Sequence, residues 1–187
     1  GFCIPVSQCF GAKDYVKMRR YIANSIWLSA AFAILITVTV CALTGSILHL
    51  MNTQDDIYSY AYTYIFIVFA GIPATILYNL TSSIIRSFGD SKTPVYFLLL
   101  SSGLNIVLDL VTIAIIGMGV EGAAYATVFS QLVSGLLCAV YMYKRFEIVR
   151  CTRDELKSRS RYMRDLVFMG MPMGLQYTIT AIGSVIL

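Results

Sequence analysis

The stretch TPVYFLLLSSGLNIVLDLVTIAIIGMGVEGAAYATVFSQLVSGLLCAVYMY, residues 93–143, decides the fold class. It consists of two apolar runs joined by a glycine-rich turn at 117–122, and its only charged residues are Asp109 and Glu121. Each run is long enough for a helix to cross the roughly 30 Å hydrocarbon core of a bilayer. A membrane-spanning β-barrel would instead show alternating strands of about ten residues. The stretch therefore predicts a helical hairpin within a membrane.

The composition extends this prediction to the whole chain. Of its 187 residues, 58% are hydrophobic and 13% are charged, whereas a typical soluble domain has about 25% charged residues. A net charge of +4 on so apolar a chain is not the basic footprint of a nucleic-acid-binding protein. The five cysteines contain no CxxC pair, which argues against a zinc site. We expect an all-α polytopic transmembrane helix bundle without a nucleic-acid partner or an organic cofactor.

Windows without charged residues locate the individual spans. Residues 21–54, 57–85, 122–143 and 166–187 contain no Lys, Arg, Asp or Glu. We expect complete spans over 21–50, 57–85, 94–116 and 120–143, preceded by the end of a helix at 1–10 and followed by the start of another near 166. Because the chain begins and ends within apolar runs, we expect it to be an internal segment of a longer membrane protein.

The basic residues predict the direction of these spans. All fourteen Lys and Arg lie within 13–20, 86–92 and 144–164. The two other connections between spans, at 52–56 and 117–121, contain acidic residues but no Lys or Arg. The positive-inside rule then places the loops 11–20, 86–93 and 144–165 in the cytoplasm. We expect an integral protein of the plasma membrane.

Asp109 is the one charged residue in the middle of a predicted span, where a carboxylate costs about 2.5–3.5 kcal/mol on insertion scales. Asn105 lies one turn before it on the same helix face. Counting about 1.5 Å per residue along the two helices of the hairpin places Thr127 at about the same depth in the membrane as Asp109. Their oxygen atoms suit a hard cation such as Na⁺, and the same pocket suits a proton. A purely structural set of interhelical hydrogen bonds is the alternative.

Two prolines and a few other residues invite weaker hypotheses. Pro73 lies in the middle of one span and Pro172 near the start of the last, so each is either a packing kink or a moving hinge. Tyr78 and Asn79 either face a cavity or make ordinary contacts between helices. The methionines at 169, 171 and 173 either form an adaptable binding wall or simply pack.

Four segments resemble the multidrug and toxic compound extrusion (MATE) family of transporters. They are PVSQCFGAKD (5–14), RSFGDSKTP (86–94), LNIVLD (104–109) and GMGVEGAAYATVFSQ (117–131). The resemblance implies a twelve-helix protein with two six-helix lobes, of which this chain covers the end of helix 2 through the start of helix 7. Residues 1–143 would then lie in the N-terminal lobe, 144–165 in the cytoplasmic linker between the lobes, and 166–187 in the first helix of the C-terminal lobe.

The resemblance also implies a function. Members of the family export organic cations and other drugs in exchange for Na⁺ or H⁺ by alternating access, so the chain would belong to a transporter rather than an enzyme. Asp109, Asn105 and Thr127 match the cation site of the first lobe, which also uses an acidic residue on helix 1. The implied partners are the lipid bilayer, a small organic substrate and the remaining helices of the full-length chain. A flippase for lipid-linked saccharides and a non-transporting membrane scaffold are the alternatives.

Overall fold

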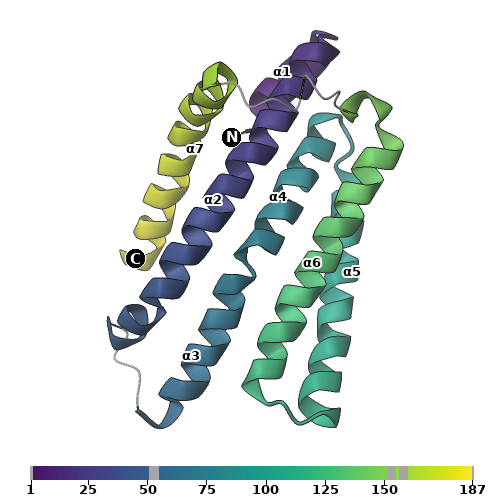
Figure 1. Cartoon of the computed structure of the whole chain (residues 1–187). Coiled ribbons are helices and arrows are strands. Elements are labelled where there is room, and N and C mark those ends of the chain that lie inside the picture. Colours follow the sequence, from purple (N-terminus) through teal and green to yellow (C-terminus); the bar gives the residue numbers. More distant parts are fainter. Residues whose placement is uncertain (1, 51–54, 151–154, 156–159, 187) are drawn as a thin grey trace.

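The computed structural model describes residues 2–50, 55–150, 155 and 160–186, and the elements that it describes are all helical (Figure 1). Residues 151–154 and 156–159 of the expected linker lie outside the described residues. The elements follow in the order α1 (Ile4–Gly11), α2 (Tyr15–Leu50), α3 (Asp55–Ala70), α4 (Ile72–Ser87), α5 (Lys92–Asp109), the π-helix η1 (Leu110–Ile115), α6 (Val120–Arg145), the 3-10 helix η2 (Glu147–Val149) and α7 (Ser160–Ile186).

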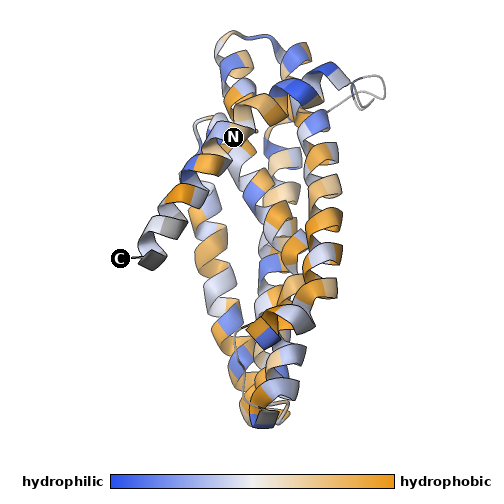
Figure 2. Ribbon diagram, turned by 90° about the vertical axis from the view of Figure 1, so that its left-hand side faces the viewer, coloured by the Kyte–Doolittle hydropathy of each residue, from blue (hydrophilic) through white to orange (hydrophobic). Residues whose placement is uncertain are grey.

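The spans expected from the sequence are present as helices. Four segments of the described chain are long and apolar enough to cross a membrane, namely Tyr15–Leu50, Asp56–Ser87, Lys92–Ile115 and Val120–Arg145. Their middle portions are largely hydrophobic, and hydrophilic residues gather at the end of the bundle that carries α1 (Figure 2). The all-α transmembrane bundle is therefore confirmed. The last helix starts at Ser160, inside the polar segment that precedes the apolar run.

The helices pack around two central elements. α6 packs against α3, α4 and α5, and α2 packs against α1, α3, α4 and α7. The buried core gathers where the basic loops meet the bundle, with Met18, Ile22, Ile84, Ile85 and Cys138 all fully buried. Large side chains on the outer faces of the middle of the bundle are exposed, as expected for surfaces that contact lipid.

The polar segment after α6 is attached to the start of α2. Arg19 donates two hydrogen bonds of 2.8 Å, from Nε and Nη2, to the two carboxylate oxygens of Glu155, whose side chain is 8% exposed. The Tyr21 hydroxyl also donates to the Asp165 carboxylate of α7 at 3.4 Å. A paired guanidinium and carboxylate fix both position and orientation, so this contact anchors the segment between α6 and α7.

The span from Asp56 to Ser87 is bent near its middle. α3 ends at Ala70 and α4 begins at Ile72, with Pro73 in its first turn. Proline has no amide hydrogen to donate, so a helix that contains one loses a backbone hydrogen bond. The helix is interrupted at this point, and the two interpretations of Pro73, a packing kink and a moving hinge, stay predictions. Pro172 lies inside α7, which continues through it.

Gly71 at the bend touches α6 so closely that only glycine fits. A Cβ atom there would lie 2.4 Å from Cγ2 of Val128 and 3.1 Å from the Val68 carbonyl oxygen.

Gly71→Ala should therefore destabilise the full-length protein by about 1–3 kcal/mol through overpacking. Thermal unfolding in detergent measures the change. Adding Val128→Ala should restore much of the loss, and Gly103→Ala, whose Cβ has no neighbour within 4 Å, should not destabilise. A Gly71→Ala protein as stable as the native one contradicts this packing.

Asp90 holds the loop between α4 and α5 in place. Its Oδ1 accepts a 3.1 Å hydrogen bond from the Thr93 amide, and its Oδ2 accepts one of 3.0 Å from the Tyr141 hydroxyl on α6. The hydrogen bonds from Thr93, aided by the Tyr141 hydroxyl, lower the pKa of the Asp90 carboxyl group below its ordinary value. The ionised form is therefore the one that joins this loop to α6.

This lowered pKa predicts how stability depends on pH. A carboxyl group with a depressed folded-state pKa stabilises the protein above its unfolded-state pKa of about 3.9 and stops doing so as the pH falls through the folded-state value. The stability difference between the native protein and Asp90→Asn should thus be full at neutral pH and should shrink below pH 4. Unfolding of both proteins across this range measures it. A difference that is constant with pH would show that the Asp90 charge plays no part.

Candidate functional site

The turn after η1 brings α5 and α6 together. Gly117 and Gly119 have φ values of 74° and 60°, a region that favours glycine, and the Met118 amide donates to the Thr112 carbonyl at 2.9 Å. Gly122, at the start of α6, lies so close to η1 that an added Cβ would be 2.8 Å from Cβ and Oγ1 of Thr112. The glycines of this segment therefore make the tight hairpin that the sequence predicted.

Polar side chains join α5 to α6 along the length of this hairpin. The Ser101 hydroxyl donates to the Ser130 carbonyl at 2.9 Å, and the Ser134 hydroxyl donates to the Phe97 carbonyl at 3.1 Å. Nearer the turn, Asn105 Nδ2 donates to Thr127 Oγ1 at 3.4 Å. Small residues that bond across a helix pair let the two backbones approach closely within a membrane.

A cavity of about 310 Å³ lies between α4, α5 and α6, and we name it the polar cavity. Thr75 on α4 donates a short hydrogen bond to the Gln131 side chain on α6 across it. The volume of the polar cavity is near the lower end of the range of roughly 300–1,000 Å³ found for ligand pockets. It is lined by one aliphatic residue and ten residues with hydroxyl or amide groups: Thr75, Tyr78, Asn79, Leu98, Ser101, Ser102, Asn105, Thr127, Ser130, Gln131 and Ser134.

The structure brings together two of the three residues predicted to bind a cation. Asn105 and Thr127 are hydrogen-bonded to each other and both line the polar cavity. Asp109 lies one turn further along α5, is not part of that lining, and forms no side-chain hydrogen bond with the described residues. Its Oδ1 is buried without a hydrogen-bond partner. The three residues therefore form a short column rather than a closed cluster.

The helix changes its geometry directly after Asp109. The six residues Leu110–Ile115 form a π-helix, and the Ile116 amide donates to the Val111 carbonyl, five residues back. Short π-helical segments occur frequently at functional sites, because they change the angle at which the adjoining side chains project. Asp109 is thus positioned by the junction of an α-helix with a π-helix.

Most of the polar cavity was not predicted from the sequence. Thr75, Ser101, Ser130, Gln131 and Ser134 were not singled out, although the last three share a helix face with Thr127 at spacings of three and four residues. That polar face in an otherwise apolar span was the available signal. Tyr78 and Asn79 do line a cavity, which was one of their two interpretations. Among the described residues, no three His, Cys, Asp or Glu side chains gather as a metal-binding group.

Known proteins resemble this chain over nearly its whole length. The sequence model of the family described as MatE matches residues 1–111. A probable multidrug resistance protein of Bacillus subtilis strain 168, YoeA, is 28% identical over 99% of this chain and 42% of its own length. A second from the same strain, YpnP, is 32% identical over 93% of this chain and 39% of its own. The chain thus spans about two fifths of the length of these relatives.

A solved structure gives the same result for the fold. It is an outward-facing conformation of a multidrug resistance MATE family transporter, and it superposes on 97% of this chain with a TM-score of 0.87 and 28% identity. The superposition covers 40% of that transporter. The arrangement of the helices described above is therefore the arrangement found in part of that protein.

The polar cavity predicts which positions on α5 contact water. Ser102 lines the cavity, whereas Val107 on the same helix is 56% exposed and is not part of the cavity lining. In the full-length protein with its native cysteines replaced by alanine, Ser102→Cys should react with a membrane-impermeant methanethiosulfonate, because a thiolate forms only where water is present. Val107→Cys should stay unlabelled. Mass spectrometry of the adducts measures both, and equal labelling of the two positions would contradict a water-accessible cavity.

Proposed function

The chain belongs to the MATE family, and from this premise we propose that the full-length protein is a cation-coupled antiporter. It would export organic cations, drugs or other xenobiotics from the cytoplasm across the plasma membrane by alternating access. The coupling ion would be Na⁺ or H⁺, and the chain described here would form most of one lobe. The loops 11–20, 86–93 and 144–165 would face the cytoplasm.

The observation that carries the proposal is the buried, unpaired carboxylate oxygen of Asp109, one turn beyond Asn105, which lines the polar cavity. A buried acceptor without a hydrogen bond costs about 1–3 kcal/mol, and more when it is charged. A structural role would not account for that cost, because helix-to-helix contacts stabilise only when their polar groups are paired. Binding of a proton or a cation would satisfy the oxygen, and release would restore the cost.

The walls around Asp109 suit either coupling ion. Asn105 lies one turn before Asp109 on α5 and is hydrogen-bonded to Thr127 on α6, so the two supply neutral oxygen atoms from an amide and a hydroxyl. Oxygen donors of this kind are the ligands that hard cations prefer. A proton would need the carboxylate alone, so the choice between Na⁺ and H⁺ rests on experiment.

The same cavity suits the polar end of an organic substrate. Its ten polar residues carry hydroxyl or amide groups and no formal charge. They can therefore hydrogen-bond to organic ligands of different structure. The relatives named as multidrug resistance proteins support a drug as the substrate and do not favour a lipid-linked saccharide. These relatives also favour a transporter over an enzyme or a scaffold.

The bend between α3 and α4 offers a means of coupling. α4 carries Thr75, Tyr78 and Asn79 of the polar cavity and begins next to Gly71. A change of angle at this bend would move one wall of the cavity relative to α5 and α6. Ion binding can favour one such arrangement only through its different affinity for the two states. Pro73 is the proposed hinge here, and Pro172 is a second in α7.

We expect Asp109→Asn to lower the rate of coupled transport by the full-length protein strongly. The amide keeps the shape of the carboxylate but cannot be ionised, so it can hold neither a proton nor a cation by charge. Ethidium efflux from proteoliposomes, driven separately by Na⁺ and pH gradients, should fall by roughly tenfold or more, as follows from losing about 1.4 kcal/mol of ion binding. The gradient that drives the native protein identifies the coupling ion.

Glu121→Gln is the matched control, because it removes one carboxylate from the first turn of α6, outside the lining of the polar cavity. Its efflux should equal that of the native protein. Efflux by Asp109→Asn at the native rate would reduce Asp109 to a structural residue. Absence of ethidium efflux from folded native protein, under both gradients, would contradict organic-cation export itself.

A further inference from the structure

The outer face of α6 carries a continuous stripe of exposed apolar side chains. They follow one another at spacings of three or four residues, so they lie along one face of the helix. We name them the α6 stripe: Phe129, Leu132, Leu136, Val140 and Tyr143. Ser134 and Gly135, by contrast, face α5 and α4. The α6 stripe therefore points away from these two helices, and the proposed transport cycle makes no use of it.

The α6 stripe is long enough to contact a lipid chain over a whole leaflet. At about 1.5 Å per residue, it extends about 21 Å from Phe129 to Tyr143. One leaflet supplies about half of the roughly 30 Å hydrocarbon core of a bilayer. Tyrosine is enriched at the level of the lipid headgroups. Tyr143, in the last turn of α6, thus marks the end of the α6 stripe that meets the membrane surface.

Positive charge gathers at this end of the α6 stripe. Cζ of Arg150 lies 5.3 Å from the centre of the Tyr143 ring, a distance at which a guanidinium is attracted to the ring face. Lys144 follows Val140 by four residues, so it lies on the same helix face as the α6 stripe. The segment YKRFEIVR, residues 143–150, contains three basic residues and one acidic residue. An anion is therefore attracted to the place where the α6 stripe reaches the headgroups.

A short folded segment holds Arg150 beside Tyr143. Val149 is buried in the core, its amide donates to the Phe146 carbonyl at 3.0 Å, and the Arg150 amide donates to the Glu147 carbonyl at 3.1 Å. Arg150 Nη1 also lies 3.7 Å from Glu147 Oε1, but both side chains are exposed, and exposed ion pairs of this kind contribute little. The position of Arg150 is thus set by its backbone, and its guanidinium remains available to an anion.

We propose that the α6 stripe, together with Arg150 and Lys144, binds an anionic phospholipid from the leaflet that the basic loops face. The headgroup phosphate contacts the Arg150 guanidinium and the Lys144 ammonium, and an acyl chain lies along the α6 stripe. Arginine suits this role because its planar guanidinium can donate two parallel hydrogen bonds to a phosphate. A zwitterionic lipid has the same chains but no net negative charge, so it binds more weakly. The site is independent of transport and is tested by binding alone.

Crosslinking with photoactivatable lipids tests the proposal. The full-length protein would be placed in phosphatidylcholine nanodiscs that contain an equal, small fraction of phosphatidylglycerol or phosphatidylcholine with a diazirine on one acyl chain. On illumination the diazirine loses N₂, and the resulting carbene inserts into a neighbouring bond of the protein. Peptide mass spectrometry should find adducts on the α6 stripe that are roughly tenfold more abundant for phosphatidylglycerol, a preference of 1.4 kcal/mol.

An excess of glycerophosphoglycerol, the same headgroup without its chains, distinguishes a lipid site from a site for a free phosphate. It should leave the adducts on the α6 stripe unchanged, because it cannot contact the apolar side chains. Removal of the adducts by this compound would overturn the proposal, since the α6 stripe would then contribute nothing to binding.

Variants matched in charge locate the site. Lys144→Gln with Arg150→Gln should remove the preference for phosphatidylglycerol. Arg161→Gln with Arg164→Gln removes the same charge from the start of α7, which lies on the other side of the bundle from α6, and should label like the native protein (Figure 1). All four side chains are exposed, so both variants should fold.

Equal loss of the preference in the two double variants would overturn the proposal, because it would show a general attraction of the basic surface for anionic lipid. So would equal labelling of the native protein by the two lipids, a result that does not depend on any variant. Absence of adducts from the α6 stripe would also overturn it, by showing that other helices of the full-length chain cover this face.

Discussion

The structure depends on one constraint: within a bilayer, no water is available to hydrogen-bond the peptide groups. Every span is therefore a helix, and polar side chains must bond to their own helix or to each other. Ser25, Thr44 and Thr81 bond back to carbonyls four residues earlier, which satisfies them without a neighbour. Ser101 and Ser134 instead bond to the neighbouring helix and hold α5 against α6. The polar cavity is the place where such groups gather in excess of what packing requires.

Asp109 stands out against this pattern because its buried oxygen has no partner in the described structure. Asn105, one turn before it on α5, is hydrogen-bonded to Thr127, and a π-helix begins directly after it. The bend at Gly71 lies one turn before Thr75, which lines the polar cavity from α4. Under the proposed function, Asp109 would bind the coupling ion and the bend at Gly71 would change its angle during transport. That combination is what a coupled transporter requires, and a rigid scaffold has no use for it.

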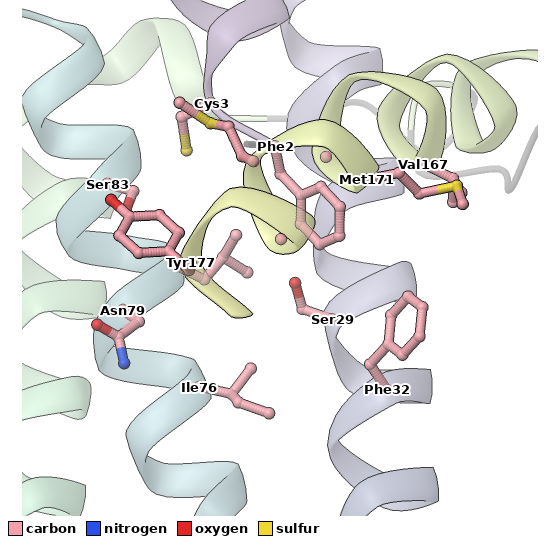
Figure 3. A pocket seen from close by; sticks show the side chains of 14 residues that line it. Phe2, Cys3, Ser29, Phe32, Ile76, Asn79, Ser83, Val167, Met171 and Tyr177 are labelled. Carbon is pink, nitrogen blue, oxygen red and sulfur yellow. The ribbon is translucent and has the colours of Figure 1, made fainter. Parts of the chain in front are cut away.

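The sequence predicted the spans well, because length and apolarity are properties of each segment alone. The turn at 117–122 could also be predicted, since glycine signals the backbone conformation that Gly117 and Gly119 adopt. The register between helices could not, because it depends on the packing of small residues such as Gly122 and Ser101. For the same reason the polar residues that join α5 to α6 were predicted only in part, through Asn105 and Thr127. A second cavity, between α2, α4 and α7, could not be predicted, because Phe2 and Tyr177 in its wall come from opposite ends of the chain (Figure 3).

The central claim is that the Asp109 carboxyl group binds the coupling ion. Infrared difference spectroscopy of the purified full-length protein tests it most directly, since a carboxyl group absorbs differently when it is protonated, free or bound to a cation. Spectra would be recorded on adding Na⁺ and on lowering the pH, for the native protein and for Asp109→Asn. In the native protein we expect a carboxyl band that changes with one of these ions, and in Asp109→Asn we expect that band to be missing. Identical difference spectra for the two proteins would contradict it.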